Sequence, residues 1–384
     1  MALAGLVITL LGAPLLFFSY AEAGEVGVTY GRLGDNLPDP ETVSQLLVDN
    51  GITMVRLYDA DEAVLTALAN TGIKVTVMMR NEELAAAAAS RSYALQWVQC
   101  NVSAYYPDTL ISGVAVGNEV FKEAPELNSQ LVPAMNNVQL ALEELGLADA
   151  VKVSTPIAFT ALKDTSVPSS ARFRDDIAQS VMVPMLQFLQ RTGSYLSMNP
   201  YPFFAYAEDP QNIQLDYALG NYKPGVRDRN TGLVYHSLLD AMMDATYYAM
   251  ENLTGSLNVM QATGGGSTPD TQWSENGWGS QGQVKPAKPP RKGSRGLQQA
   301  GNGFQPATVA NAKAYNNYVI NRVLSCKTGT PHRPNADMNI FIFALFNENQ
   351  KGQGPNDVEQ YFGLFYPNMT KVYDFDFRSG NVGL

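Results

Sequence analysis

The sequence predicts a (β/α)8 barrel, or TIM barrel, built as a single α/β domain. Short runs rich in β-forming residues alternate with longer stretches of helical periodicity. The short runs are almost continuously apolar, which is typical of a parallel sheet covered by helices. Eight such runs within about 360 residues suit a closed barrel of the larger kind. An open, doubly wound sheet is the alternative, because periodicity does not show whether a sheet closes.

The expected strands share a high content of Val, Ile, Leu and Met. In chain order they are Glu25–Tyr30, Ile52–Asp59, Ile73–Met79, Ile111–Gly117, Val151–Ile157, Ser194–Tyr201, Leu257–Gln261 and Met338–Phe346. Seven are followed by a helical pattern, and several of these patterns stop at a glycine. The expected helices are Pro40–Asn50, Asp61–Asn70, Glu82–Tyr105, Leu127–Leu145, Arg172–Arg191, Ser237–Asn252 and Thr308–Val323.

The first 23 residues have the pattern of a secretory signal peptide. Residues 5–18 are apolar and uncharged, and Ala21-Glu22-Ala23 has the small-x-small form of a cleavage site. The sequence therefore predicts a signal peptide at 1–23 and a barrel domain at 24–384, with no membrane span after cleavage. An N-terminal anchor is the alternative. In a secreted protein the Asn-x-Ser/Thr sequences at Asn101, Asn252 and Asn368 are candidate glycan sites.

Composition excludes several classes of function. The chain has 36 acidic and 26 basic residues and a formal charge of −10, which argues against binding to nucleic acid. Two Cys and two His are too few for a Cys-rich zinc module or a His-rich metal cluster, so we expect no metal and no cofactor. The sequence does not show whether Cys100 and Cys326 form a disulfide. Carboxylates remain as the expected carriers of the chemistry.

One stretch interrupts the alternation of strands and helices. Residues 262–306 are rich in Gly and Pro and show neither strand nor helix periodicity. We expect a Gly/Pro-rich loop insertion over about 262–306. A loop of this length is unusual inside a compact barrel.

Polar and aromatic residues follow the predicted strands. Catalytic groups of a β/α barrel lie at the carboxyl ends of its strands. The residues at these ends include Tyr30, Tyr58, Asn118, Glu119, Asn199, Tyr201, Phe204 and Glu348. Carboxylates beside aromatic rings suit a sugar, whose hydroxyls need polar partners and whose apolar face stacks on rings. Two carboxylates can also supply the acid and the nucleophile or base of glycoside hydrolysis.

Four segments resemble glycoside hydrolase family 17, the plant endo-β-1,3-glucanases. They are VRLYDAD (Val55–Asp61), VAVGNEV (Val114–Val120), NPYPFFAY (Asn199–Tyr206) and FALFNENQK (Phe343–Lys351). The likeness covers nearly all of residues 25–377 apart from the long loop. It implies a retaining mechanism, with the acid after the fourth strand and the nucleophile after the seventh.

The resemblance also implies roles for individual residues. Glu119 matches the acid/base, which works best with a raised pKa. Asn118 matches a donor or acceptor for the sugar 2-hydroxyl. Glu348 and Lys351 match a supporting carboxylate and its cation, and Glu359 matches a further carboxylate.

The nucleophile has two partial matches to the family pattern Glu-Thr-Gly-Trp-Pro-Ser. The segment beginning at Ala262 follows the expected strand Leu257–Gln261, but has Ala where the Glu belongs. The segment beginning at Glu275 keeps the Glu and has Trp278 at the Trp position, although TPDTQW before it is a poor strand. Because an alanine cannot form a glycosyl ester, we predict Glu275 as nucleophile and Trp278 as a sugar platform.

These observations together predict a secreted, monomeric enzyme of the extracellular space or cell wall. Its expected substrate is a β-1,3-glucan polysaccharide, cleaved at internal bonds. The alternative is a catalytically impaired β-glucan-binding barrel, which would follow if Ala262 occupied the nucleophile position.

Overall fold

The computed structural model describes residues 24–255, 268–284 and 305–378. The expected signal peptide at 1–23 and the expected strand Leu257–Gln261 lie outside the described residues. Ala262 lies outside them as well.

A parallel barrel forms the centre of the molecule. Within the described residues nine strands form one sheet, in the order β5-β4-β3-β2-β1-β13-β12-β9-β6. They are β1 (Val26–Tyr30), β2 (Met54–Leu57), β3 (Lys74–Met79), β4 (Ile111–Val116), β5 (Lys152–Ser154), β6 (Pro156–Ala158), β9 (Tyr195–Asn199), β12 (Asp270–Asn276) and β13 (Asn339–Ile342). The two outermost strands, β5 and β6, are separated in the chain only by Thr155. They act as one barrel strand that pairs with β4 on one side and β9 on the other, so the sheet closes.

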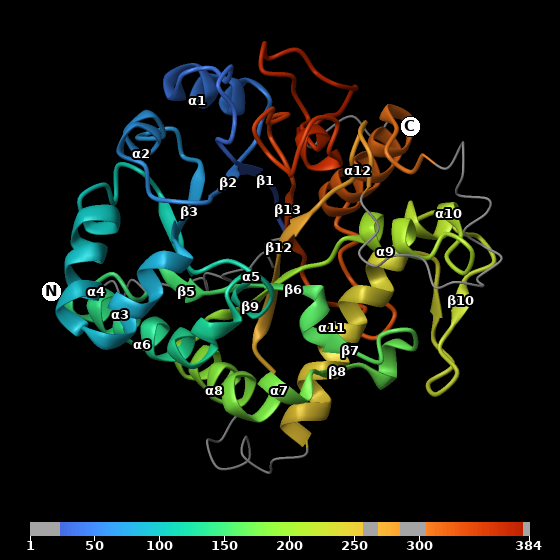
Figure 1. Ribbon diagram of the computed structural model, residues 1–384, viewed down its shortest axis with the longest axis horizontal. Coiled ribbons are helices and arrows are strands. Elements are labelled where there is room, and N and C mark those ends of the chain that lie inside the picture. The colour runs from blue at the N-terminus through green and yellow to red at the C-terminus, as the bar shows by residue number, and fades with distance from the viewer. Residues whose placement is uncertain (1–23, 256–267, 285–304, 379–384) are drawn as a thin grey trace, which may run out of the picture.

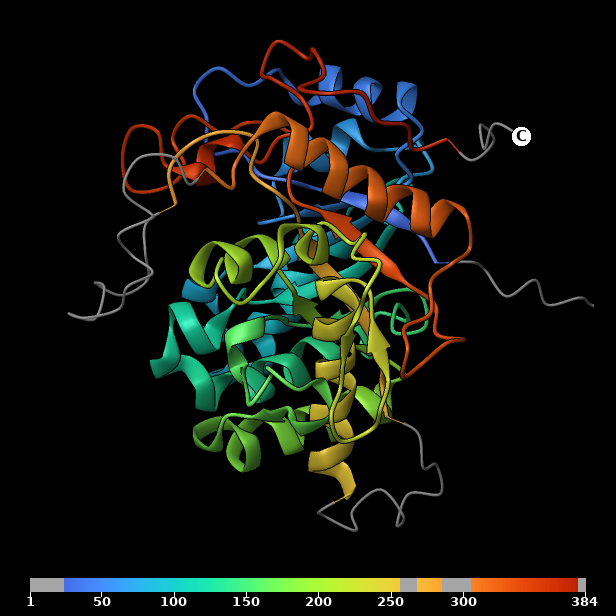
Figure 2. The ribbon, with the colours of Figure 1, turned by 90° about the vertical axis from the view of Figure 1, so that its right-hand side faces the viewer.

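Helices surround this barrel in chain order (Figure 1). They are α1 (Pro40–Asp49), α2 (Glu62–Ala67), α3 (Leu84–Ala89), α4 (Arg91–Val98), α5 (Val120–Glu123), α6 (Asn128–Glu144), α7 (Asp175–Ile177), α8 (Val183–Thr192), α9 (Pro202–Glu208), α10 (Leu215–Ala218), α11 (Leu238–Gly255) and α12 (Val309–Leu324). Figure 2 shows α12 lying over β1 and β13. The predicted (β/α)8 barrel is confirmed, and the open sheet is excluded by the closure.

The seventh barrel strand differs from the prediction. Part of the range expected to be loop, Asp270–Asn276, is β12, which pairs in parallel with β9 and β13. The expectation that residues 262–306 contain no strand is therefore wrong. The sequence of β12, DTQWSEN, is mostly polar and therefore does not show the apolar pattern expected of a buried strand. Its polar side chains can be buried because several of them have buried hydrogen-bond partners. One of them is Asn276, whose Nδ2 donates to the carbonyl of Phe341 at 2.8 Å.

Two predicted helices are also divided. The Ala-rich stretch Glu82–Tyr105 is interrupted at Ser90, whose hydroxyl caps α4 by accepting from the backbone N–H of Tyr93. The stretch Arg172–Arg191 begins instead with the two-residue strand β8 (Arg172–Phe173). This strand pairs with β7 (Leu162–Lys163) in an antiparallel hairpin, and the helix proper is α8. A second small hairpin joins β10 (Val226–Arg227) to β11 (Val234–Tyr235).

Trp273 of β12 is packed in the core, so its substitution tests whether this segment is a barrel strand. Its side chain is fully buried and lies edge-on to Tyr247 of α11, with ring centroids 5.8 Å apart. We expect Trp273→Ala to lower the free energy of unfolding by about 3–5 kcal/mol, because it leaves a large cavity. Urea unfolding followed by circular dichroism measures the change. Leu140→Ala, at an exposed position on α6, is the control and should change stability by less than about 0.5 kcal/mol. Equal stability losses in the two variants would contradict this packing.

Candidate active site

The strands bring the predicted carboxylates and amides together at one end of the barrel. Asn118 and Glu119 follow β4, and Asn199 is the last residue of β9. Glu275 is the penultimate residue of β12, and Glu348 lies a few residues beyond β13. All five therefore lie at carboxyl ends of strands, where barrel enzymes place their chemistry.

Glu119 is held in an unusual backbone conformation. Its φ is +47°, in the left-handed region that non-glycine residues seldom adopt. Its N–H donates to the carbonyl of Pro156 at 2.9 Å. The preceding Asn118 is fixed by Asn81, whose amide accepts from the N–H of Asn118 at 2.8 Å and donates to its carbonyl at 3.0 Å. The loop that presents Glu119 is therefore tied to the two neighbouring strand ends.

A fully buried cation, Arg56 of β2, lies at the centre of the site. Its Nη1 donates to Oε1 of Glu275 at 2.6 Å and to the carbonyl of Ser274 at 2.9 Å. Its Nη2 donates to Oδ1 of Asn118 at 2.7 Å. Since β1 and β13 separate β2 from β12 in the sheet, Arg56 reaches Glu275 through the barrel interior. Among the described residues none accepts a hydrogen bond from the amide Nδ2 of Asn118, whose oxygen is occupied by Arg56.

Glu275 is buried and paired, with a side chain 8 % exposed. Its second oxygen, Oε2, accepts from the hydroxyl of Tyr201 at 2.8 Å. Burial alone would raise the pKa of Glu275, but the charges of Arg56 and Lys351 and the hydrogen bonds from Tyr201 and Arg56 lower it below its usual value. Burial and the charge of Glu275 raise the pKa of Tyr201 well above the ordinary tyrosine value, so its hydroxyl keeps its proton. Glu275 is consequently ionised and held from both sides.

A second set of contacts links Glu119 back to β12. Asn199 donates from Nδ2 to Oε1 of Glu119 at 2.9 Å, while its Oδ1 accepts from the hydroxyl of Ser274 at 2.6 Å. The other oxygen of Glu119 lies 3.1 Å from Nζ of Lys122 on α5. Two residues thus connect the carboxylates. Arg56 bonds to Glu275 and to Asn118, the residue before Glu119. Asn199 bonds to Glu119 and to Ser274, the residue before Glu275.

Glu348 and Lys351 lie beside this pair. Glu348 is 2 % exposed and accepts the N–H of Leu33 at 2.8 Å. A Cβ added at Gly31 would come within 2.4 Å of its carboxylate, so this approach requires a glycine. Nζ of Lys351 lies 3.8 Å from Oε2 of Glu348 and 3.9 Å from the ring centroid of Phe343. Because Glu348 is so deeply buried, it positions Lys351 and the loop after β1 and does not offer a surface for contact with a ligand.

The predicted aromatic residues differ in exposure. Tyr58, Tyr201 and Phe204 are partly exposed, and Tyr201 packs against Phe204 with centroids 5.3 Å apart. Tyr58 contacts both cations, since its ring centroid lies 5.0 Å from the Arg56 guanidinium and 5.6 Å from Nζ of Lys351. Tyr30 is only 3 % exposed and packs edge-on against Phe346, so its ring lies beneath the site.

The prediction that Trp278 is a sugar platform is wrong for this structure. Its side chain has no exposed surface, so neither ring face can stack on a ligand. Its Nε1 donates to the carbonyl of Pro306 at 2.9 Å, and its ring packs against Phe203 and Tyr315 at centroid distances of 5.2 and 5.5 Å. Trp278 therefore fixes the segment after β12 between α9 and α12.

Glu359, the further carboxylate, has a different environment from Glu275. It lies in the short 3-10 helix Val358–Tyr361. Burial, together with the charges of Glu275 and Asp357, raises its pKa, although Lys351 partly opposes this. The pKa of Glu359 and the pKa of Glu275 are therefore shifted in opposite directions.

The sequence did not reveal Arg56, Asn81 or Ser274 as site residues. Each acts through contacts with residues distant in the chain, which no local pattern records. The one available signal was the Arg within the apolar strand Met54–Leu57, because a buried charge needs a partner.

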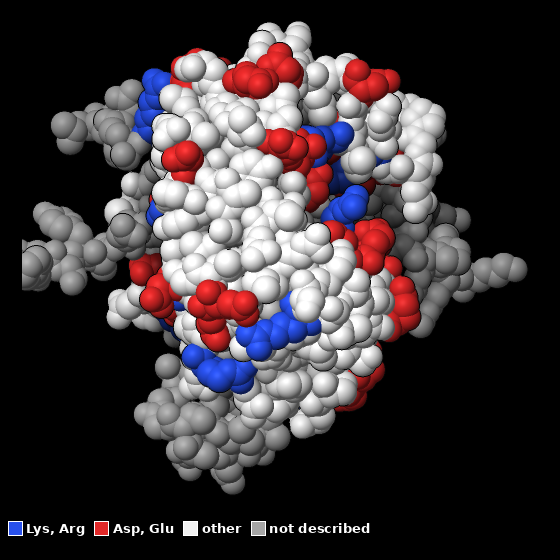
Figure 3. All heavy atoms as spheres, turned by 90° about the vertical axis from the view of Figure 1, so that its left-hand side faces the viewer, with Lys and Arg blue, Asp and Glu red and all other residues white. Residues whose placement is uncertain are grey.

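The remaining predictions concern the two cysteines, the charged surface and membrane-spanning helices. Cys100 and Cys326 are both exposed and unpaired. On the face that carries α3, α4 and α6, acidic and basic side chains lie next to one another (Figure 3). Within residues 24–255, 268–284 and 305–378, no helix combines the length and apolar character needed to cross a membrane.

Comparison with known proteins agrees with the geometry. The family model "Glycosyl hydrolases family 17" matches residues 26–289 and 293–377. The chain is 41% identical over 356 residues to glucan endo-1,3-beta-glucosidase GV of Hordeum vulgare, covering 91% of this chain and 98% of that protein. It is 37% identical over 371 residues to glucan endo-1,3-beta-glucosidase 13 of Arabidopsis thaliana, covering 96% of this chain and 67% of that one.

A solved structure is similar over almost its whole length. It is CJP38, a beta-1,3-glucanase and allergen of Cryptomeria japonica pollen, with a TM-score of 0.78 and 40% identity, covering 92% of this chain and 99% of the other. The chain spans about two thirds of several Arabidopsis relatives, 63% in one case. Sequence, barrel and strand-end glutamates together show that this chain is a glycoside hydrolase of family 17.

Proposed function

We propose that the protein hydrolyses internal β-1,3-glucosidic bonds of β-glucans with retention of configuration. The observation that carries the proposal is the position of Glu275. It lies at the end of the seventh barrel strand, buried, ionised and held by Arg56 and Tyr201. The family relatives named as glucan endo-1,3-beta-glucosidases support the choice of substrate.

In the first step Glu119 would protonate the leaving glycosidic oxygen while Glu275 attacks the anomeric carbon. The bond to the leaving sugar breaks, and a glycosyl ester forms on Glu275. In the second step Glu119, now ionised, would take a proton from water, which displaces Glu275. Asn118 has a free amide N–H group for the sugar 2-hydroxyl, because Arg56 already occupies its oxygen.

The supporting residues would hold Glu275 in its ionised form. Arg56, Tyr201 and Lys351 stabilise the negative charge on Glu275. Tyr58 and Phe204 are partly exposed and would contact sugar rings.

We also propose that the protein acts as a monomer, is secreted after cleavage of residues 1–23, and works in the cell wall. The impaired, glucan-binding alternative loses its basis, since a described barrel strand carries a glutamate at the nucleophile end.

Substitution of either glutamate tests the proposal. The wild-type protein should release reducing ends from a linear β-1,3-glucan, and Glu119→Gln should lower turnover by about 10²–10⁴-fold. Glu275→Gln should lower it by at least as much, because an amide cannot form the ester. Glu126→Gln, at an exposed position near α5, is the matched control and should retain full activity. Glucan binding by the wild type without release of reducing ends would instead support the impaired barrel.

Azide rescue distinguishes the two roles. In Glu275→Gly, azide would attack an aryl β-glucoside substrate directly and give an α-glycosyl azide. In Glu119→Gly, azide would displace Glu275 from the α-linked ester and give a β-glycosyl azide. Proton NMR of the products measures the anomeric configuration. An α-azide from a Glu359→Gly variant, with none from Glu275→Gly, would overturn the nucleophile assignment.

Tyr201→Phe should change the pH profile of the enzyme. The hydroxyl of Tyr201 lowers the pKa of Glu275, so its removal raises that pKa. Activity requires ionised Glu275, and the acid limb of kcat/KM should therefore move to higher pH. A hydrogen bond to a charged group is worth about 1.5–3 kcal/mol, which corresponds to a shift of roughly one to two pH units. Tyr366→Phe, at an exposed loop position, should leave the profile unchanged. An unmoved acid limb in Tyr201→Phe would contradict the role of this hydroxyl.

A further inference from the structure

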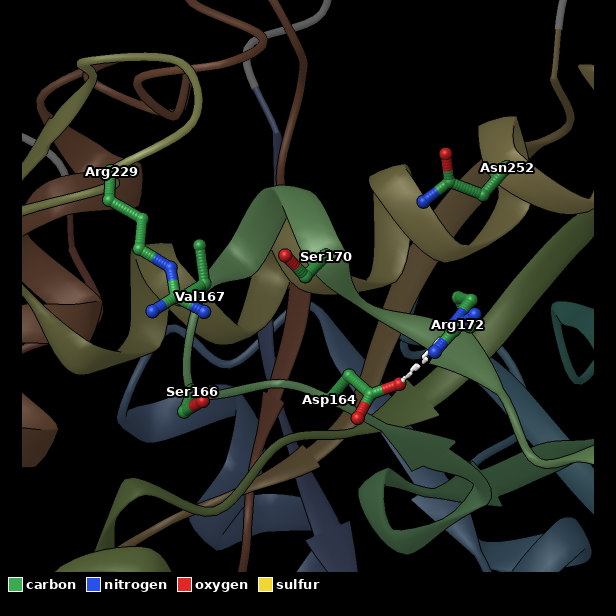
Figure 4. Close-up of a pocket in the computed structure, with 7 residues that line it drawn as sticks. All are labelled: Asp164, Ser166, Val167, Ser170, Arg172, Arg229 and Asn252. Atoms are coloured by element: carbon green, nitrogen blue, oxygen red, sulfur yellow. Dashed lines mark hydrogen bonds and ion pairs between the residues drawn. The ribbon is translucent and has the colours of Figure 1, made fainter.

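A polar pocket of about 570 Å³ lies on the outer side of the barrel, away from the site described above. It is lined by residues of the β7–β8 region, the β10–β11 loop and α11, namely Asp164, Ser166, Val167, Ser170, Arg172, Arg229 and Asn252 (Figure 4). Asn252 lies in the last turn of α11, and barrel helices run back toward the amino ends of the strands. The pocket shares no lining residue with the site around Glu275.

The walls of this pocket are fixed by a buried carboxylate, Asp228, which is 2 % exposed. It accepts hydrogen bonds from the N–H and the hydroxyl of Ser169, both at 2.9 Å, and from the N–H groups of Asn230 and Thr231. Nδ2 of Asn230 donates to the hydroxyl of Ser170 at 2.9 Å. The β10–β11 loop is thereby joined to the segment between β7 and β8, and the pocket is formed before any ligand enters.

Asn252 is the first residue of an Asn-Leu-Thr glycosylation sequence and lines the pocket. Its side chain is exposed, and Nδ2 donates one hydrogen bond, to the carbonyl of Ala171 at 3.0 Å. An amide nitrogen has two hydrogens, so one remains for attachment of a sugar while the other keeps this bond. In Figure 4 the amide nitrogen points toward the other lining residues. A sugar joined to it would enter the pocket.

The other two candidate sequences differ from this one. Asn101 is only partly exposed, and its Nδ2 donates to the carbonyl of Trp97 within the helical segment Gln99–Ser103 and α4. Asn368 is exposed in a turn, where its Oδ1 accepts from the N–H and hydroxyl of Thr370. Neither Asn101 nor Asn368 lines this pocket.

The lining of the pocket suits an N-acetylated sugar. Arg172 and Asp164 form an exposed ion pair at 2.5 Å and offer donors and acceptors to hydroxyl groups. Arg229 has no hydrogen bond or ion pair with any described residue, so its guanidinium is available too. Val167 offers an apolar contact for an acetyl methyl group. The volume lies within the range of ~300–1,000 Å³ that is common for small-molecule sites.

We propose that Asn252 carries an N-linked glycan whose first N-acetylglucosamine occupies this pocket. In the transfer a bond forms between Nδ2 of Asn252 and C1 of the sugar. The bond from C1 to the pyrophosphate of a lipid-linked oligosaccharide breaks, and Nδ2 loses one proton. The inference rests on the secretion included in the proposed function, but not on the glucanase activity.

Glycopeptide mass spectrometry tests the modification. The full chain is secreted from a yeast host behind that host's own leader, so that the result does not depend on residues 1–23. We expect near-complete modification of Asn252 and none of Asn101. Thr254→Ala should abolish modification at Asn252 and leave Asn368 unaffected. Unmodified Asn252 in secreted protein whose Asn368 is modified would overturn the proposal.

The rate of enzymatic deglycosylation tests the position of the sugar. A glycan seated in the pocket should be released by peptide N-glycosidase F at least ~10-fold more slowly from native than from unfolded protein, because the Asn–sugar bond is covered. Asp164→Ala/Arg172→Ala should remove most of that difference. The control is Arg91→Ala/Glu144→Ala, which removes an ion pair of similar exposure on α4 and α6. Equal release rates from native wild type and native Asp164→Ala/Arg172→Ala would exclude seating in this pocket.

Discussion

The site depends on one buried cation, the guanidinium of Arg56. A charge without exposed surface is stable in a protein interior only when it is paired and hydrogen-bonded. Glu275 supplies the opposite charge, and the carbonyl of Ser274 and the amide of Asn118 accept further bonds. Removal of either charged partner would leave the other buried and uncompensated, which typically costs about 3–5 kcal/mol. The same contact therefore stabilises the barrel interior and positions Glu275, the proposed nucleophile.

This constraint explains why the seventh strand was misjudged from sequence. Parallel barrel strands are usually apolar on both faces, and the other predicted strands were found on that basis. In β12 the polar residues Ser274 and Glu275 face partners from β2 and β9, so their polarity is compensated by contacts that lie far away in the chain. Trp278 was misjudged for a related reason. The family motif predicted a sugar platform at Trp278. Whether its ring is exposed depends on its packing against Phe203 and Tyr315, which the motif does not show.

The residues at the carboxyl ends of the strands were more predictable than the residues that support them. Glu119 and Glu348 lie a few residues beyond the ends of apolar strands, and a barrel puts such residues at one rim. Asn199 was also expected at a strand end. Its role is different from the one predicted, because both ends of its amide are occupied by Glu119 and Ser274. Sequence spacing identifies which residues reach the rim, whereas the pairing between strands determines which of them contact substrate and which position a neighbour.

Glu119 and Glu275 differ in their hydrogen-bond partners, and this difference suits the division of roles proposed for them. Glu275 receives its hydrogen bonds from a permanent cation and from a tyrosine that keeps its proton, so its negative charge is stabilised before substrate arrives. Glu119 is bonded to a neutral amide and to Lys122, whose side chain is 52 % exposed. Arg56, by contrast, has no exposed side-chain surface. The fold therefore stabilises the anionic state of Glu275 before substrate arrives, which suits its proposed role as nucleophile.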